Sequence, residues 1–189
     1  MKAFNLKRFV KIGLCGFATA LLLSNWVGVF AKNMSTDSYR SLPFPNNLKH
    51  YEVEIFRLVD ASHSTDPKTK ISYYDPQFAK LFETVVKNFS GLDKRLKQKI
   101  LSGPAPQGKY IEIGNSPYIF YTICQAHWCN VTNLHILYQP GKQRIAGRLL
   151  YECGIHEFGD VSKEEMQVIN QISPTNVDDE DCKFVKGKK

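Results

Sequence analysis

The sequence predicts an α+β domain, with a central antiparallel β-sheet, flanking helices and a disulfide-closed loop that protrudes from the sheet. Three observations predict it. An amphipathic helix pattern covers residues 75–89, strand patterns with short turn signals fill residues 109–152, and a second helix pattern follows residue 162. Consecutive strands with short connections pair antiparallel, so helices before and after such a block are expected to pack on the resulting sheet.

The first strong helix begins at Asp75, which suits the N-cap, and Pro76 suits the first turn. A shorter, more basic helix is predicted over residues 92–101. The last helix begins with a capping box, Ser162 and Glu165, in which each side chain caps the other's backbone N–H. The first helix carries apolar residues at helical spacing: Phe78, Leu81, Phe82, Val85, Val86 and Phe89.

The strand block is predicted from β-branched and aromatic runs between Gly, Pro and Asn turn signals. Residues 118–121 are apolar at every position, which indicates a central strand covered on both faces. After Cys153 the chain is predicted to form a loop, and no element is predicted after Pro174. Strands are predicted over 109–114, 118–124, 131–139 and 144–152.

Residues 32–74, which precede the first strong helix, carry weaker patterns. Residues 32–49 are polar and aperiodic and are predicted to be a tail or linker. Residues 51–59 alternate and predict a strand, and residues 60–70 form a polar loop. The predicted organisation is therefore an N-terminal extension over 32–74 and a domain over 75–189.

Residues 1–31 have the three regions of a secretory signal peptide. A basic start precedes an uncharged apolar run over residues 12–23, and Val29-Phe30-Ala31 offers a cleavage site after Ala31. An uncleaved anchor is the alternative, but the apolar run is short for a bilayer span. A periplasmic or secreted protein is expected. The four basic residues are Lys2, Lys7, Arg8 and Lys11.

Cleavage changes both the charge and the cysteine count. Residues 1–31 hold four basic and no acidic residues, so the formal charge falls from +7 to +3, and Cys15 is lost. The lower charge removes the argument for nucleic-acid or membrane partners of the mature chain. An exported protein with four cysteines is expected to form two disulfides. Three pairings are open; we favour Cys124–Cys129 with Cys153–Cys182, because the first pair brackets a short polar loop.

That loop carries the candidate functional residues. Trp128 is the only tryptophan of residues 32–189, and tryptophan is a frequent binding hot spot. His127 can donate and accept hydrogen bonds, which suits a carboxylate-lined cleft. A crosslink would leave the loop little ordering entropy to lose on binding. The loop residues are Cys124, Gln125, Ala126, His127, Trp128 and Cys129.

Other interpretations of the loop stay open. The crosslink can be a structural staple, and Trp128 can fold back onto the sheet. A metal site would draw on Cys124, His127, Cys129 and His156, but their spacing matches no structural zinc pattern. The chain contains no G-x-S-x-G, phosphate-loop or H-E-x-x-H motif, so neither an enzyme nor a cofactor is predicted.

The loop resembles the signature of the Ivy family, bacterial periplasmic inhibitors of vertebrate lysozyme. The family has C-K-P-H-D-C between two sheet strands, and this chain has C-Q-A-H-W-C with both cysteines and His127 in register. The helix before it, the strands on either side and the hairpin over 136–147 are also similar. The resemblance covers about residues 75–172 of this chain.

The resemblance implies an inhibitor of C-type lysozyme that protects peptidoglycan from the host enzyme and so serves virulence. Its loop would enter the active-site cleft, where His127 would hydrogen-bond the catalytic carboxylates. The family's Lys, Pro and Asp are replaced by Gln125, Ala126 and Trp128. These replacements motivate an alternative, the same fold bound to another partner such as a lytic transglycosylase or a host protein. A metal or redox protein is a further alternative, and a homodimer stays open for any of these functions.

Overall fold

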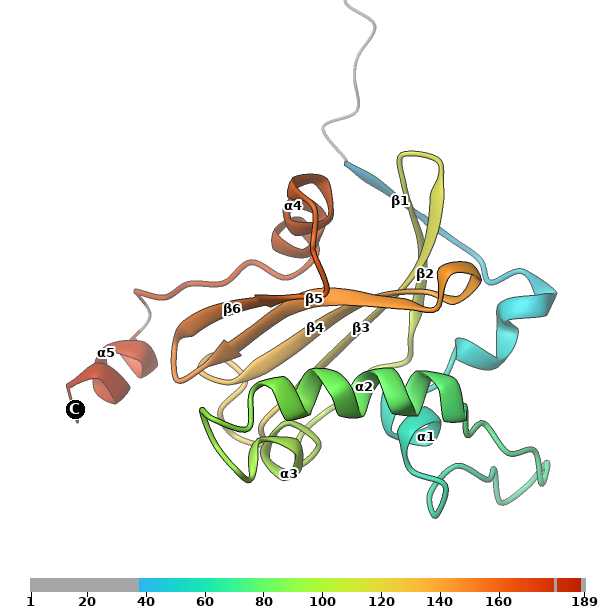
Figure 1. The fold of residues 1–189 in the computed structure, drawn as a ribbon, viewed down its shortest axis with the longest axis horizontal. Coiled ribbons are helices and arrows are strands. Elements are labelled where there is room, and N and C mark those ends of the chain that lie inside the picture. The colour runs from blue at the N-terminus through green and yellow to red at the C-terminus, as the bar shows by residue number, and fades with distance from the viewer. Residues whose placement is uncertain (1–37, 179, 188–189) are drawn as a thin grey trace, which may run out of the picture. The chain divides into compact units, whose positions relative to one another are not determined.

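The computed structural model describes residues 38–178 and 180–187, and the predicted signal peptide lies outside them. The described residues belong to one compact unit, and they form a single six-stranded sheet with helices on both faces (Figure 1). The α+β class with a central antiparallel sheet is confirmed. No helix among the described residues is long and apolar enough to cross a membrane.

Every strand pairs antiparallel with the next strand along the chain, so the spatial order equals the sequence order. The predicted strands are found, with bounds that differ by a few residues. The strands are β1 Tyr39–Leu42, β2 Lys109–Ile113, β3 Ser116–Cys124, β4 Asn133–Gln139, β5 Arg144–Tyr151 and β6 Gly154–Phe158.

Helices cover both faces of the sheet. In Figure 1 the helices α1, α2 and α3 lie on one side of the sheet and α4 lies on the other. Each face of the sheet has its own hydrophobic core, and alternate side chains of β3 pack into the two cores. Ile119 and Tyr121 lie in the larger core, and Tyr118 and Phe120 lie in the smaller one. The helices are α1 Ile55–Val59, α2 Pro76–Asn88, α3 Leu96–Ile100, α4 Lys163–Ile172 and α5 Glu180–Lys186, with 3-10 turns at Asn46–Tyr51 and Pro140–Lys142.

The start of α2 is confirmed as predicted. The Asp75 carboxylate accepts hydrogen bonds from the backbone N–H groups of Gln77 and Phe78, both at 2.9 Å. These bonds satisfy two of the free donors that every helix start exposes. Phe78 and Phe82 are fully buried against the sheet, so the apolar face of the helix is core. The basic helix α3 is shorter than predicted, because residues 92–95 form turns.

The segment before Asp75 is not an extension from residue 38 onward. It contributes β1 to the sheet and buries Ile55 and Leu58 completely, and the Tyr121 hydroxyl donates to the Tyr51 carbonyl at 2.7 Å. The strand predicted over 51–59 is wrong, since a 3-10 turn and α1 occupy this region. Its apolar residues also recur at helical spacing, so the short pattern fitted both periods.

The loop predicted after Cys153 is also wrong, because β6 lies there and pairs with β5. The two residues between these strands, Glu152 and Cys153, both have positive φ, at 46° and 64°. Two-residue hairpins of this kind are usually marked by Asn-Gly or Asp-Gly. The Glu-Cys sequence carries no such signal, which is why the hairpin was not predicted.

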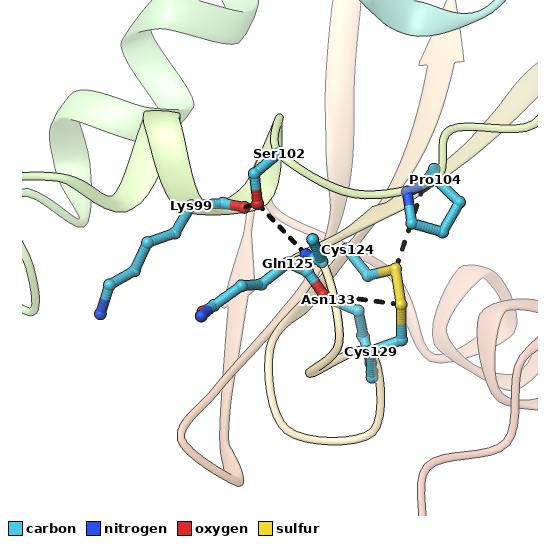
Figure 2. Close-up of a disulfide and its surroundings, with 8 residues drawn as sticks. Lys99, Ser102, Pro104, Cys124, Gln125, Cys129 and Asn133 are labelled. Atoms are coloured by element: carbon cyan, nitrogen blue, oxygen red, sulfur yellow. Dashed lines mark hydrogen bonds between the residues drawn. A yellow bond between two sulfur atoms is a disulfide. The ribbon is translucent and has the colours of Figure 1, made fainter.

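Both favoured disulfides are formed. Cys124–Cys129 closes the loop between β3 and β4 (Figure 2), and Cys153–Cys182 ties the β5–β6 turn to α5. Disulfides persist in oxidising compartments, so they are compatible with an exported protein. In the entropic model the second disulfide closes the longer loop and restricts the unfolded chain more.

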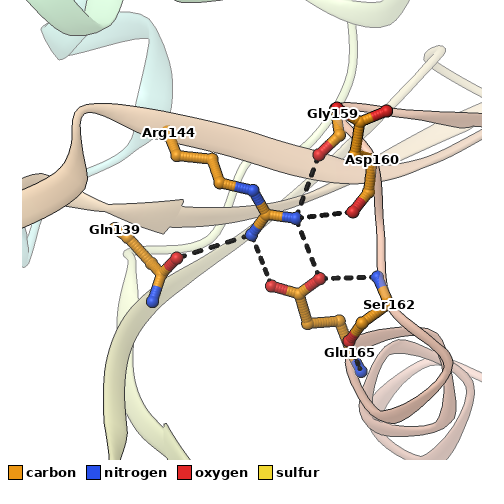
Figure 3. Close-up of polar contacts among 6 residues, drawn as sticks. All are labelled: Gln139, Arg144, Gly159, Asp160, Ser162 and Glu165. Carbon is orange, nitrogen blue, oxygen red and sulfur yellow. Dashed lines mark hydrogen bonds and ion pairs between the residues drawn. The ribbon is translucent and has the colours of Figure 1, made fainter.

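A partly buried ion pair anchors α4 to the sheet (Figure 3). Both Nη atoms of Arg144 contact the Glu165 carboxylate, at 2.5 and 3.0 Å, and Arg144 also donates to the carbonyls of Gly159 and Asp160. The same carboxylate accepts the Ser162 N–H at 2.7 Å and completes the predicted capping box. Burial raises the pKa of Glu165, but the bonds from Arg144 and Ser162 outweigh it and lower the pKa to about 2.

Replacing Glu165 with Gln is expected to lower the free energy of unfolding at pH 7 by about 2 kcal/mol, because charge-assisted bonds to Arg144 are lost. The folded pKa lies below the unfolded one. The contribution of Glu165 is therefore present above its ordinary pKa and is lost as pH falls towards 2. Urea unfolding at pH 7 and pH 3 tests this. The control is Glu164→Gln at an exposed neighbour, and an equal loss in both variants would contradict the prediction.

Candidate functional site

The candidate site is the loop over residues 124–129, which leaves the sheet between the end of β3 and the start of β4. Figure 2 shows the disulfide across its base, and β3 and β4 pair up to Cys124 and Asn133. Both ends of the loop are therefore held by the sheet as well as by the crosslink. The structure brings the six predicted loop residues together in one closed ring.

Backbone hydrogen bonds hold the ring from within. The Trp128 N–H donates to the Gln125 carbonyl at 3.0 Å, and the Thr132 N–H donates to the Trp128 carbonyl at 2.8 Å. The side-chain amide of Asn133 adds a bond to the Cys129 carbonyl, to which its Nδ2 donates at 2.7 Å. Groups satisfied in this way do not need to reorganise when a partner approaches. The loop is therefore ordered before it binds.

The connection between α3 and β2 supports the ring from outside. The Ala126 N–H donates to Ser102 Oγ at 3.1 Å. A Cβ on Gly103 would lie 2.3 Å from the Cys124 carbonyl oxygen and 2.7 Å from the Ala126 nitrogen. Only glycine permits this close approach. Gly103 follows the helix predicted over residues 92–101, and nothing in its local sequence indicated that it packs against the loop.

His127 lies exposed on the ring, with a left-handed backbone at φ 64°. No hydrogen bond or ion pair within the described part of the chain involves its side chain. Left-handed geometry costs a non-glycine residue energy, and such positions recur at binding sites. The imidazole is available to an incoming acceptor or donor.

Trp128 is 37% exposed and lies beside a hollow of about 270 Å³. Val131 forms one wall, and Phe184 and Val185 of α5 form another. The Cys153–Cys182 disulfide holds α5 in this position. Trp128 is therefore partly covered and borders this hollow. The contribution of α5 was missed, because the acidic start of this helix has no apolar periodicity.

A basic rim borders the other side of the ring. Arg95 and Lys99 line a second hollow with Gln125 and Ala126. Lys99 pairs with Asp93 at 2.5 Å, and this partner raises the lysine pKa, so the ammonium is charged at neutral pH. Next to the ring the surface therefore carries the positive charge of Arg95, the Lys99–Asp93 ion pair and apolar groups of α5.

Three of the residues considered as metal ligands have other partners. Cys124 and Cys129 are bonded to each other and offer no thiolate, and His156 instead packs on Phe89, with ring centres 5.9 Å apart. The described residues contain no group of three or more His, Cys, Asp or Glu side chains placed to hold a metal ion. The metal ligands considered from the sequence are therefore not brought together.

Replacing Gly103 with Ala is expected to displace the ring and to lower the free energy of unfolding by about 2 kcal/mol, because the new Cβ would overlap backbone atoms. Amide NMR shifts of residues 124–129 and urea unfolding measure the two effects. Gly91→Ala is the matched control, since no atom lies within 4 Å of its Cβ position. Unchanged loop shifts in the Gly103 variant would contradict the close packing.

No protein-family model matches the chain, and no curated protein and no solved structure is significantly similar to it.

Proposed function

We propose that this protein is an exported inhibitor of lysozyme-type enzymes, which inserts the ring over residues 124–129 into their active-site cleft. One observation carries the proposal. The ring is closed by a disulfide, held by backbone hydrogen bonds, and exposes His127 with no partner within the described residues. A rigid, narrow projection with a polar tip suits a narrow cleft better than it suits a flat protein surface.

The chemistry of the tip suits such a target. Glycoside hydrolases of the lysozyme type place two carboxyl groups across the scissile bond. An imidazole can donate to one carboxylate, and it gains a charge-assisted bond when protonated. No catalytic chemistry is required of the inhibitor, because occupying the cleft excludes the glycan.

The surface around the tip supplies further contacts. Trp128 and Phe184 offer apolar area beside the ring, and Arg95 offers positive charge. The exported chain has a formal charge of +3, and C-type lysozymes are basic. Long-range steering therefore does not favour the encounter. Affinity is expected to come from short-range contacts in the cleft.

The resemblance of the loop to the Ivy signature supports the same proposal. Both cysteines and His127 occupy the family's positions, and the ring lies between two sheet strands as the resemblance implies. The predicted signal peptide would deliver the protein to the compartment where such enzymes act.

A second candidate target is a less basic enzyme that cleaves peptidoglycan, such as a lytic transglycosylase. Arg95 next to the ring favours it, since its guanidinium would attract an acidic cleft, whereas Lys99 is already paired with Asp93. Assays against both enzyme classes at two salt concentrations distinguish the candidates. Inhibition that weakens steeply with salt would point to the acidic target.

Replacing His127 with Ala is expected to weaken inhibition about 10-fold to 100-fold, the effect of losing one hydrogen bond to a charged group. Lysis of cell-wall substrate by lysozyme, with increasing amounts of residues 32–189, gives the inhibition constant. His63→Ala is the control, because His63 is exposed and interacts with Asp60 far along the chain from the ring. Circular dichroism shows whether each variant is folded.

Two results would overturn the proposal. One is full inhibition by the His127 variant. The other is no inhibition of any lysozyme or lytic transglycosylase by the natural chain at micromolar concentration. In the second case the ring has another partner or a purely structural role.

Labelling with 5-fluorotryptophan reports insertion directly, because Trp128 is the only tryptophan of residues 32–189. Adding lysozyme is expected to shift the single ¹⁹F signal, since the partly exposed indole of Trp128 enters a new environment. Lysozyme whose cleft is filled with chitotriose is the control and is expected to leave the signal unchanged. An equal shift with filled and empty clefts would place the contact outside the cleft.

A further inference from the structure

A polar cavity of about 270 Å³ lies behind the ring, on the face of the sheet that α4 covers. Its walls come from the adjoining ends of β3, β4 and β5 and from the segment that follows α4. The side chains that matter are Asn133 and His135 of β4 and Thr175 after α4, together with Ser173. The Cys124–Cys129 disulfide also borders the cavity, but His127 and Trp128 do not, so the proposed inhibition does not use it.

A buried cation adjoins the cavity. Arg148 is only 1% exposed, and its guanidinium donates to the Asn170 side chain and, at 2.9 Å, to the Ser173 carbonyl. Its Nη2 also lies 3.3 Å from His135 Nδ1. All of these partners are neutral acceptors. No carboxylate among residues 38–178 and 180–187 forms an ion pair with Arg148.

His135 cannot supply the missing negative charge. It is buried, and burial together with the neighbouring guanidinium lowers its pKa to about 3. The imidazole is therefore neutral at physiological pH and acts only as an acceptor. An uncompensated charge in the interior destabilises the fold unless a counter-charge or water reaches it.

Three buried polar atoms in this region have no hydrogen-bond partner. They are Arg148 Nε, Asn133 Oδ1 and Thr175 Oγ1. Asn133 and Thr175 line the cavity, and Arg148 contacts two further residues that line it, His135 and Ser173. Buried polar atoms are rarely left unpaired, and the two that line the cavity, with the buried cation behind its wall, point to a molecule that pairs with them.

We propose that this cavity binds a small carboxylate that also carries a hydroxyl group, a 2-hydroxy acid being the simplest class. The carboxylate accepts from Thr175 Oγ1 and places a negative charge beside the wall formed by His135 and Ser173, behind which Arg148 lies. The ligand's hydroxyl donates to Asn133 Oδ1, which as a carbonyl oxygen can only accept. The cavity has room for a ligand of this size.

The test is a titration of ¹⁵N-labelled residues 32–189, followed by NMR, with three molecules of nearly equal size. Lactate has both groups, propionate lacks the hydroxyl, and lactamide lacks the charge. Lactate is expected to cause saturable shifts at Asn133, Thr175 and Arg148 Nε, with a dissociation constant on the order of 1 mM. Propionate is expected to bind more weakly, and lactamide the weakest.

The matched variants are Thr175→Val and Thr84→Val. The first removes a cavity hydroxyl at constant shape and is expected to weaken lactate binding about 10-fold. The second removes an exposed hydroxyl of α2, on the opposite face, and is expected to leave binding unchanged. Absence of saturable shifts with lactate would overturn the proposal and leave water as the occupant. Equal binding of lactate and lactamide would also overturn it, because the cavity would then not select an anion.

Discussion

The fold depends on the burial of β3 and β4 on both faces. Ile119 and Tyr121 of β3 pack under the α2 layer, while Tyr118 and Phe120 pack under the α4 layer. A slip of one residue in register would exchange the two sets of side chains between layers of different shape. The register is therefore strongly specified. It places Cys124 opposite Asn133, and so determines where the ring leaves the sheet.

The paired strands β3 and β4 also make the site rigid. The sheet holds both ends of the ring, the Cys124–Cys129 disulfide closes it, and Ser102 with Gly103 supports it from α3. The second disulfide adds α5, and with it Phe184, to the surface next to Trp128. Two crosslinks distant in sequence thus organise the same end of the molecule, and each contributes a different part of the candidate interface.

Sequence patterns predicted the elements whose signals are local. The caps of α2 and α4, the strand runs and the disulfide-closed ring were all predicted, because capping, side-chain period and cysteine spacing act over a few residues. Features that depend on distant contacts were not. Gly103 acts through an approach to Cys124, the Glu152–Cys153 turn lacks the usual residues, and α5 is tied by Cys182 to Cys153, a partner distant in sequence.

Two arginines of β5 have partners of different charge. Arg144 and Arg148 are four residues apart, so both point to the face that α4 covers. α4 supplies the Glu165 carboxylate to Arg144 but only the neutral Asn170 amide to Arg148. A buried ion pair contributes little net stability, and a buried charge without a partner reduces it. Stability alone therefore does not explain an unpaired guanidinium at Arg148. An anionic ligand in the adjoining cavity would explain it, because its negative charge would offset that of Arg148, as the Glu165 carboxylate offsets that of Arg144.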